Sequence, residues 1–238
     1  MRFLLLLLAP LLLLQGKRVR ARTIRLPEAE GQRWGITGNA NSAPLRALVL
    51  GDSAAAGVGC HFQQEAVTGH WVAALSSKHQ VHWQLVAQSS LTCAGVLQLL
   101  KATLLKFEKA DVVLVSVGVN DVTRRTSVRQ WKNDLLAMTQ HLTHHLGATD
   151  IIYTALPPMH KFPALPQPLR MFVGSQAKRL NQALQAHCTQ QANTHYLAFE
   201  VPFKEEYMAG DGYHPSAKAA ALWGRAASTI ITSAGIVT

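Results

Sequence analysis

The chain has 238 residues, of which 48% are hydrophobic and only 15% are charged, so it can bury a full core in one or at most two domains. This composition excludes an intrinsically disordered chain. The net charge of +10 is uneven, because six basic residues precede the first acid, Glu28, and leave about +4 for the rest. The charge therefore indicates a basic segment beside a hydrophobic terminus, and it gives no reason to expect a nucleic-acid partner.

Residues 1–22 combine an apolar run, residues 3–14, with a basic flank. The run is shorter than the ~17–25 residues of a membrane-spanning helix, and its length is typical of a signal peptide. However, no small-x-small cleavage site follows it, and the basic residues between positions 17 and 22 favour the cytoplasmic side. We therefore expect an uncleaved membrane anchor that holds the protein on the cytoplasmic face of the inner membrane. The alternative is a cleaved signal peptide and a secreted or periplasmic protein.

The next segment, residues 23–45, contains Gly, Pro, Asn and Ser without hydrophobic periodicity, which predicts a linker. From residue 46 onward, short apolar segments alternate with amphipathic ones. The apolar segments predict five strands, at 46–51, 81–87, 110–118, 150–158 and 194–199. The amphipathic segments predict five helices, at 65–79, 93–109, 127–147, 174–192 and 215–235. This alternation predicts a single α/β domain over residues 46–238, with three layers, α/β/α, around a mainly parallel sheet of about five strands.

Four of the predicted strands end in small or polar residues. The first ends in GDS (51–53), Ser90 follows the second, Asn120 follows the third, and DGYH (211–214) follows the fifth. Because the carboxyl ends of parallel strands meet at one edge of a sheet, we expect these residues to lie together. The glycine-rich loop 51–59 does not match G-x-G-x-x-G, a P-loop or G-x-S-x-G, so the pattern does not favour a phosphate-binding loop.

These residue types suit acyl transfer to a serine. A serine hydroxyl needs a base to accept its proton, and His214 is the only histidine on the predicted rim around Ser53. Asp211 stands three residues before His214, where its carboxylate can orient the imidazole. The negative oxygen that develops in acyl transfer needs fixed donors. The backbone N–H groups of Ser53 and Ser90 and the side-chain amide of Asn120 are the candidates for this oxyanion hole.

Other residues of these motifs receive structural roles. We expect Asp52 and Asp121 to hold their loops by hydrogen bonds, and the small residues 54–57 to leave the approach to Ser53 open. Each motif taken alone is also typical of a simple turn. Their joint occurrence, in this order and at these strand ends, favours catalysis.

Histidine and cysteine patterns elsewhere favour structural roles. His141, His144 and His145 have helical spacing without a carboxylate or cysteine partner, which favours a solvated helix face over a metal site. The three cysteines, residues 60, 93 and 188, are widely spaced and predict reduced thiols. We therefore expect no metal and no cofactor.

The motifs resemble those of the SGNH, or GDSL-type, hydrolases. GDS at 51–53 matches the first block of that family, GVND at 118–121 the third, and DGYHPS at 211–216 the last. The second block usually supplies a glycine, and the aligned position here is Ser90. A serine keeps the backbone N–H but is strained where the backbone requires a positive φ.

The resemblance implies a flavodoxin-like fold of the SGNH hydrolase type. It also implies Ser53 as nucleophile, His214 as base, Asp211 as the acid that supports it, and Asn120 in the oxyanion hole. The implied activity is that of a serine esterase that forms an acyl-enzyme with a small carboxylic ester or thioester, such as a lysophospholipid or an acetylated sugar. Two alternatives stay open: a carbohydrate O-deacetylase that uses the same triad, and a scaffold that has lost turnover because of Ser90.

Overall fold

The apolar segments form the inner strands of a sheet in the computed structural model, which describes residues 2–198 and 204–233. Within these residues the sheet has six strands in the order β1-β3-β2-β4-β5-β6. They are β1 Trp34–Thr37, β2 Pro44–Gly51, β3 Gln80–Ala87, β4 Val112–Ser116, β5 Asp150–Thr154 and β6 Thr194–Leu197. All neighbouring pairs are parallel except β1 and β3, which are antiparallel. Side chains of β2, β4 and β5 are buried on both faces, as their continuous apolar pattern predicts.

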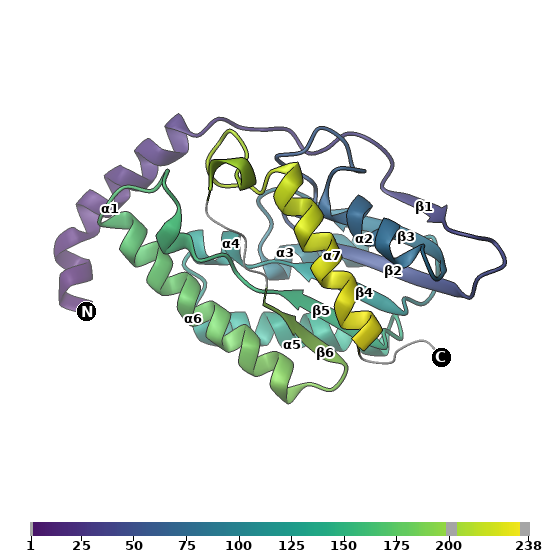
Figure 1. Ribbon diagram of the computed structural model, residues 1–238. Coiled ribbons are helices and arrows are strands. Elements are labelled where there is room, and N and C mark those ends of the chain that lie inside the picture. The colour runs from purple at the N-terminus through teal and green to yellow at the C-terminus, as the bar shows by residue number, and fades with distance from the viewer. Residues whose placement is uncertain (1, 199–203, 234–238) are drawn as a thin grey trace.

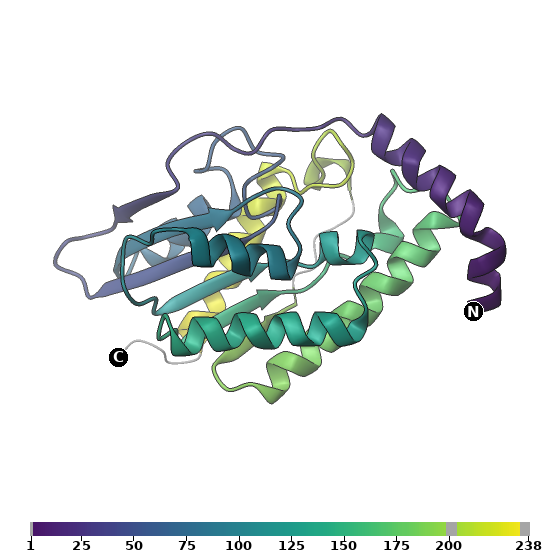
Figure 2. The same cartoon turned by 180° about the vertical axis from the view of Figure 1, so that it is seen from behind.

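Helices cover both faces of this sheet, which confirms the expected three-layer α/β/α architecture (Figures 1 and 2). The helices are α1 Arg2–Arg22, α2 Val67–Leu75, α3 Cys93–Ala102, α4 Val119–Thr123, α5 Val128–His144, α6 Leu169–Gln190 and α7 Ala217–Ser233, with 3-10 turns η1 Met159–Lys161 and η2 Glu205–Tyr207. Helices α2 and α7 pack together on one face, and α3, α5 and α6 form the layer on the other. A separate apolar cluster lies beneath each layer. The predicted strand end at 199 and helix end at 234–235 lie outside the described residues.

Residues 23–45 are not a simple linker, and this part of the prediction is wrong. They contain β1, whose residues Trp34–Thr37 pair with Val81–Gln84 of β3 and add a sixth strand at the edge of the sheet. Trp34 and Ile36 are 54% and 61% exposed, so the strand carries no buried apolar pattern that would have revealed it. It is defined by its backbone pairing with a distant segment.

Helix α3 is shorter than predicted, because it ends at Ala102 and the chain is extended at Thr103. The side chain of Gln84 on β3 holds the following residues in this path. Its amide nitrogen donates to the carbonyl of Leu104 (3.3 Å), and its oxygen accepts from the N–H of Lys106 (2.8 Å). Leu104, which lies within the range predicted to be helical, is 86% exposed.

Helix α1 lies along the beginning of α6 at one end of the molecule (Figures 1 and 2). Leu12 is only 4% exposed. Gln15 is hydrogen-bonded to the backbone at both Gln167 and Leu169. No helix in the described part of the chain has the length and hydropathy that crossing a membrane requires. The N-terminal segment therefore has contacts with the domain that the sequence did not reveal, and its anchoring role stays a prediction.

Candidate active site

Ser53 stands in a tight turn directly after β2. A side chain at Gly51 could not be accommodated there, because its Cβ would lie 2.4 Å from the carbonyl oxygen of Ser116 and 2.6 Å from the Cβ of Ala55. The N–H of Asp52 donates to the same Ser116 carbonyl (3.1 Å), and the N–H of Val58 donates to the carbonyl of Ser53 (3.0 Å). These contacts hold the half-buried Ser53 at the carboxyl edge of the sheet.

The small residues that follow Ser53 serve packing rather than access. Ala55 and Ala56 are both 0% exposed and belong to the apolar cluster under α2 and α7. Gly57 is also buried, and a Cβ there would lie 2.6 Å from the Cβ of Ala29. The expectation that residues 54–57 clear a path for the substrate is therefore wrong for these three positions, because bulky side chains are excluded by the protein interior.

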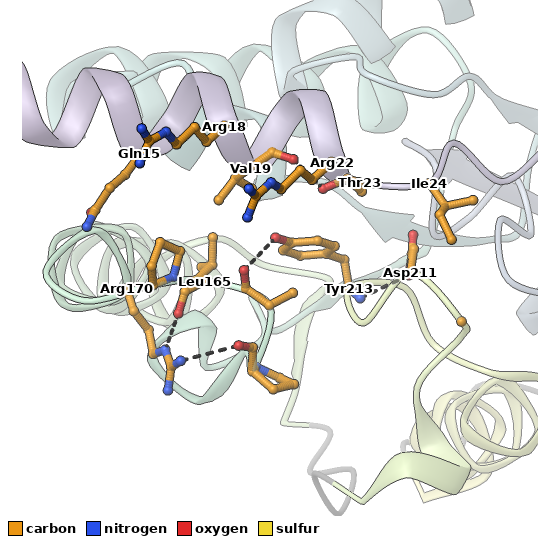
Figure 3. A pocket seen from close by; sticks show the side chains of 14 residues that line it. Gln15, Arg18, Val19, Arg22, Thr23, Ile24, Leu165, Arg170, Asp211 and Tyr213 are labelled. Atoms are coloured by element: carbon orange, nitrogen blue, oxygen red, sulfur yellow. Dashed lines mark hydrogen bonds between the residues drawn. The ribbon is translucent and has the colours of Figure 1, made fainter.

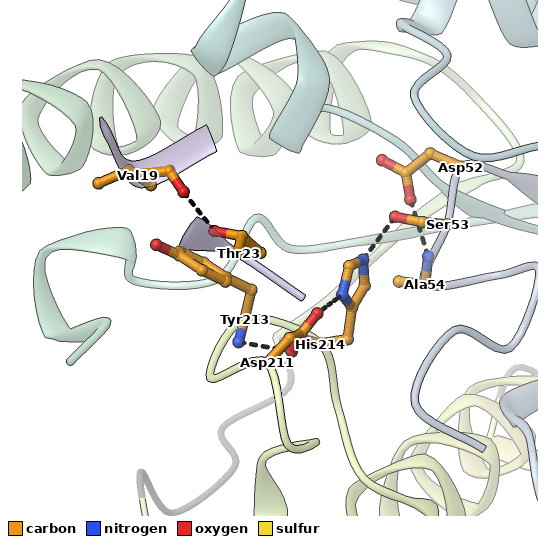
Figure 4. A network of polar contacts seen from close by, with 8 residues as sticks. All are labelled: Val19, Thr23, Asp52, Ser53, Ala54, Asp211, Tyr213 and His214. Atoms are coloured by element: carbon orange, nitrogen blue, oxygen red, sulfur yellow. Dashed lines mark hydrogen bonds and ion pairs between the residues drawn. The ribbon is translucent and has the colours of Figure 1, made fainter. Parts of the chain in front are cut away.

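Ser53, His214 and Asp211 form a continuous chain of hydrogen bonds (Figure 4). The Nε2 atom of His214 lies 2.8 Å from the Oγ of Ser53, and its Nδ1 lies 2.5 Å from the Oδ2 of Asp211. The Asp211 side chain is 1% exposed, whereas that of His214 is 26% exposed. The structure thus brings together the three side chains expected to act in catalysis, with the acid buried and the base open to solvent.

The environment of Asp211 favours its ionised form. Burial by itself would raise the pKa of this carboxyl, but hydrogen bonds to it lower the pKa below its ordinary value. They come from the imidazole of His214 and from the backbone N–H groups of Tyr213 and His214, which donate to Oδ1 at 2.9 and 3.0 Å. An ionised Asp211 accepts a hydrogen bond from the N–H at Nδ1 of His214. The other ring nitrogen, Nε2, is then unprotonated and can take the proton of Ser53.

A close approach of two loops places the histidine against the serine. Gly59, in the turn that follows Ser53, has a φ of +101°, and a Cβ there would lie 2.4 Å from the carbonyl oxygen of Pro215. Pro215 directly follows His214 in the chain. A glycine at position 59 therefore allows contact between the loop of the nucleophile and the loop of the base.

Asn120, the side-chain donor expected in the oxyanion hole, is oriented by Asp52. Asn120 lies in the first turn of the short helix α4, and Gly118, which directly precedes this helix, has a φ of +119°. The Nδ2 of Asn120 donates to Oδ2 of Asp52 (3.1 Å), and the other oxygen, Oδ1, accepts from the N–H of Ala54 (3.2 Å). One amide hydrogen of Asn120 is thereby used, and the second is available to a ligand.

Asp52 is 2% exposed, and burial raises its pKa from 3.8 to about 6. The expected loop-holding role of Asp52 is thus accompanied by a direct contact with Asn120. Asp121 has the role expected of it: its carboxylate accepts from the N–H of Cys93 (3.0 Å) and the hydroxyl of Thr126 (3.2 Å).

Ser90, the third expected oxyanion donor, has the left-handed backbone conformation that favours glycine, with a φ of +69°. Its carbonyl accepts from Arg124 (3.0 Å). The neighbouring N–H of Ser89 donates to Glu28 (2.7 Å), whose carboxylate also binds Arg33 (2.5 Å). Glu28 and Arg33 come from the expected linker, so the sequence did not suggest that they brace the Ser90 loop.

No group of three or more His, Cys, Asp or Glu side chains in residues 2–198 and 204–233 is arranged to hold a metal ion. The rings of His141 and His145 contact each other in a tilted arrangement, with centroids 4.7 Å apart.

This α/β/α fold, with a serine, a histidine and an aspartate joined at the edge of the sheet, defines a serine hydrolase. Residues 49–222 match the model of the GDSL-like lipase/acylhydrolase family. The chain belongs to this family and is a GDSL-type serine ester hydrolase, which confirms the resemblance seen in its motifs.

Individual relatives agree with this family. The chain is 28% identical over 236 residues to the GDSL-like esterase Rv1075c of Mycobacterium tuberculosis, an alignment that covers 88% of this chain and 73% of the relative. The esterase EstA from Pseudoalteromonas sp. superimposes with a TM-score of 0.60 at 21% identity, covering 79% of this chain and 97% of that one. A lipase/acylhydrolase from Enterococcus faecalis superimposes with a TM-score of 0.59 at 19% identity, covering 80% and 96%. The two structural likenesses support the fold.

Proposed function

We propose that the protein hydrolyses carboxylic esters or thioesters through an acyl-enzyme formed on Ser53. The observation that carries this proposal is the unbroken hydrogen-bonded chain from Asp211 through His214 to Ser53. In the first half-reaction the Oγ of Ser53 attacks the ester carbonyl carbon while its proton moves to Nε2 of His214. The carbonyl π electrons move to the oxygen, which becomes the oxyanion of a tetrahedral intermediate.

The oxyanion would be held by the free amide hydrogen of Asn120 and by the backbone N–H groups of Ser53 and Ser90. Collapse of the intermediate breaks the bond to the leaving alcohol or thiol, which takes the proton from Nε2 of His214. In the second half-reaction the same histidine accepts a proton from water, which attacks the acyl-enzyme. The proton then returns to the Oγ of Ser53 as the carboxylic acid departs. Asp211 stays ionised throughout and stabilises the imidazolium.

The test compares the wild type with Ser53→Ala on 4-nitrophenyl esters of short and long acyl chains. We expect hydrolysis by the wild type and none above background by the variant, with the same melting temperature for both. A 4-nitrophenyl alkylphosphonate should label Ser53 covalently, because the Oγ displaces 4-nitrophenolate from phosphorus, and mass spectrometry of the tryptic peptide would reveal the adduct; the Pseudoalteromonas esterase structure is described as inhibited by monoethylphosphonate. Absence of hydrolysis that depends on Ser53 would contradict the proposal. Activity confined to acetyl esters would favour the O-deacetylase alternative.

We also propose that residues 1–22 associate with a membrane at its cytoplasmic face. Leu11, Leu13 and Leu14 on α1 are 41%, 55% and 46% exposed, and the basic residues of positions 17–22 suit anionic headgroups. Flotation of the full-length protein with anionic vesicles should recover it in the vesicle fraction, and a Leu13→Ser, Leu14→Ser variant should float less. If, with vesicles present, both proteins stay in the vesicle-free fraction to the same extent, the proposal is contradicted.

A further inference from the structure

A cavity of about 490 Å³ lies beside the triad, between α1 and the chain before α6 (Figure 3). Its volume is within the range of sites that hold small molecules. We call it the basic cavity. The residues that define its character are Arg18, Arg22, Leu165, Arg170, Asp211 and Tyr213.

The walls of the basic cavity are held by hydrogen bonds between segments far apart in the sequence. On the α1 side, Gln15 donates to the carbonyl of Gln167 (2.7 Å) and accepts from the N–H of Leu169 (3.1 Å). The hydroxyl of Tyr213 donates to the carbonyl of Ala164 (3.1 Å) on the opposite side. The position of α1 is therefore fixed by specific polar contacts.

Arg170 holds the loop of residues 163–165, which lines the cavity opposite α1. Its Nε donates to the carbonyl of Leu165 (2.6 Å), and its Nη2 donates to that of Pro163 (3.3 Å). One guanidinium thus shapes the loop that faces α1, and it also adds positive charge to the lining of the cavity.

The charge of the basic cavity is not neutralised by the described residues. The side chains of Arg18 and Arg22 on α1 make no hydrogen bond or ion pair with them, and both residues are exposed. The one carboxylate in the lining is Asp211, and both of its oxygens already accept hydrogen bonds from the 213–214 segment. Two arginines therefore line the cavity, and neither guanidinium has a polar partner among the residues that the structure describes. Guanidinium groups are well suited to carboxylate and phosphate oxygens, which they can bind in pairs.

The basic cavity shares a wall with the catalytic loop. Asp211 lines the cavity while binding Nδ1 of His214, and Tyr213, the residue before His214, lines it as well (Figures 3 and 4). Thr23, at the end of α1, lies beside Tyr213 and also lines the cavity. A group bound there would therefore lie beside the Asp211 end of the triad.

We propose that the basic cavity binds a negatively charged group, a carboxylate or a phosphate, on the ester that Ser53 attacks. This inference rests on the proposed esterase function and adds a substrate class to it. The N-terminal helix, through Arg18 and Arg22, then takes part in substrate recognition.

Two matched pairs of esters test the proposal kinetically with full-length protein. One pair carries the charge on the leaving group, 4-acetoxybenzoate against neutral 4-acetoxybenzamide. The other carries it on the acyl group, the mono-4-nitrophenyl ester of glutaric acid against 4-nitrophenyl butyrate. For at least one pair we expect the wild type to have the higher kcat/KM on the anionic ester, mainly through a lower KM. In Arg18→Gln, Arg22→Gln the ratio of anionic to neutral kcat/KM should fall about tenfold or more.

The matched control is Arg20→Gln, which removes an exposed basic residue of α1 that does not line the cavity. It should leave the ratio unchanged. Binding of inorganic phosphate, measured by calorimetry on the same three proteins, gives a readout independent of turnover. We expect phosphate to bind the wild type and Arg20→Gln about tenfold or more tightly than the double variant.

The outcomes separate the two proposals. Equal ratios in all three proteins, or phosphate affinity that does not depend on Arg18 and Arg22, would overturn the anion site while leaving the esterase intact. No Ser53-dependent hydrolysis of any ester would overturn the proposed function and the substrate class with it. In that case phosphate binding alone would decide whether the cavity is an anion site.

Discussion

Asp52 allows a direct test of the contacts that position Asn120, because it is a buried, ionisable residue that accepts a hydrogen bond from the Asn120 amide. We consider the replacement Asp52→Asn. In the wild type, Ala54 and Asn120 each donate to a separate oxygen of the Asp52 carboxylate. An asparagine has only one oxygen, so one of these two donors loses its acceptor in the variant.

The free energy at stake follows from the pKa of Asp52, which burial raises from 3.8 to about 6. Because the folded-state pKa lies above the unfolded one, ionised Asp52 destabilises the folded protein. This penalty is complete above about pH 6 and is relieved as the pH falls through 6 towards 3.8. A difference of about two pKa units corresponds to about 3 kcal/mol. The lost hydrogen bond adds a roughly constant cost of about 1–3 kcal/mol at every pH.

Urea unfolding of both proteins between pH 4 and pH 8 isolates the contribution of Asp52. The other carboxyl groups titrate in both proteins and cancel in the difference of their unfolding free energies. Relative to Asp52→Asn, the wild type should therefore gain about 2–2.5 kcal/mol as the pH is lowered from 8 to 4, with most of the change around pH 5. A pH-independent difference would refute the argument that Asp52 is a buried carboxylate with a raised pKa. If Asn120 is the donor that loses its acceptor, kcat should fall at neutral pH as well.

Four further substitutions test the geometry of the site. Asn120→Ala should lower kcat about 10²–10³-fold with little change in KM, and an unchanged kcat would exclude Asn120 from the oxyanion hole. Asp211→Asn should lower kcat by about 10⁴, as loss of the equivalent carboxylate does in serine proteases, whereas a small effect would remove Asp211 from the triad. Ser90→Gly should raise the unfolding free energy by up to about 1 kcal/mol and retain activity, because it relieves a φ of +69° and keeps the N–H; destabilisation in urea would contradict this. Gly59→Ala should lower both the melting temperature and kcat, because its Cβ would lie 2.4 Å from the carbonyl of Pro215; a wild-type melting curve would contradict the close loop approach.

The central part of the fold could be predicted because its signals are local. Strands β2, β4 and β5 are buried on both faces and appear in the sequence as continuous apolar runs. Strand β1 could not be predicted, since it consists of four largely exposed residues that are ordered by pairing with β3. The end of α3 was also missed, because the side chain of Gln84, distant in sequence, holds the chain that follows the helix.

The triad was within reach of sequence analysis because each member follows a strand at the same edge of the sheet. The chain order of Ser53, Asp211 and His214 and the rule for parallel sheets suffice to place them together. The contacts that hold the loops around the triad could not be predicted from the sequence in the same way. The link from Asp52 to Asn120 and the brace from Glu28 to Ser89 both join residues more than sixty positions apart. Neither contact has a local pattern that distinguishes it from an ordinary turn or linker.

Residues 2–43, which precede β2, contact the catalytic domain at several places. Their composition suggested a membrane anchor and a linker, which would leave the catalytic domain complete without them. In the structure, Glu28 binds the Ser90 loop, Gln15 binds the backbone before α6, and Arg18 and Arg22 face a cavity that Asp211 also lines. A hydrophobic helix that only served as an anchor would not require polar contacts with the domain at Gln15. These contacts instead favour a segment that packs on the domain beside Asp211, and on the proposal above its Arg18 and Arg22 would favour anionic esters at Ser53.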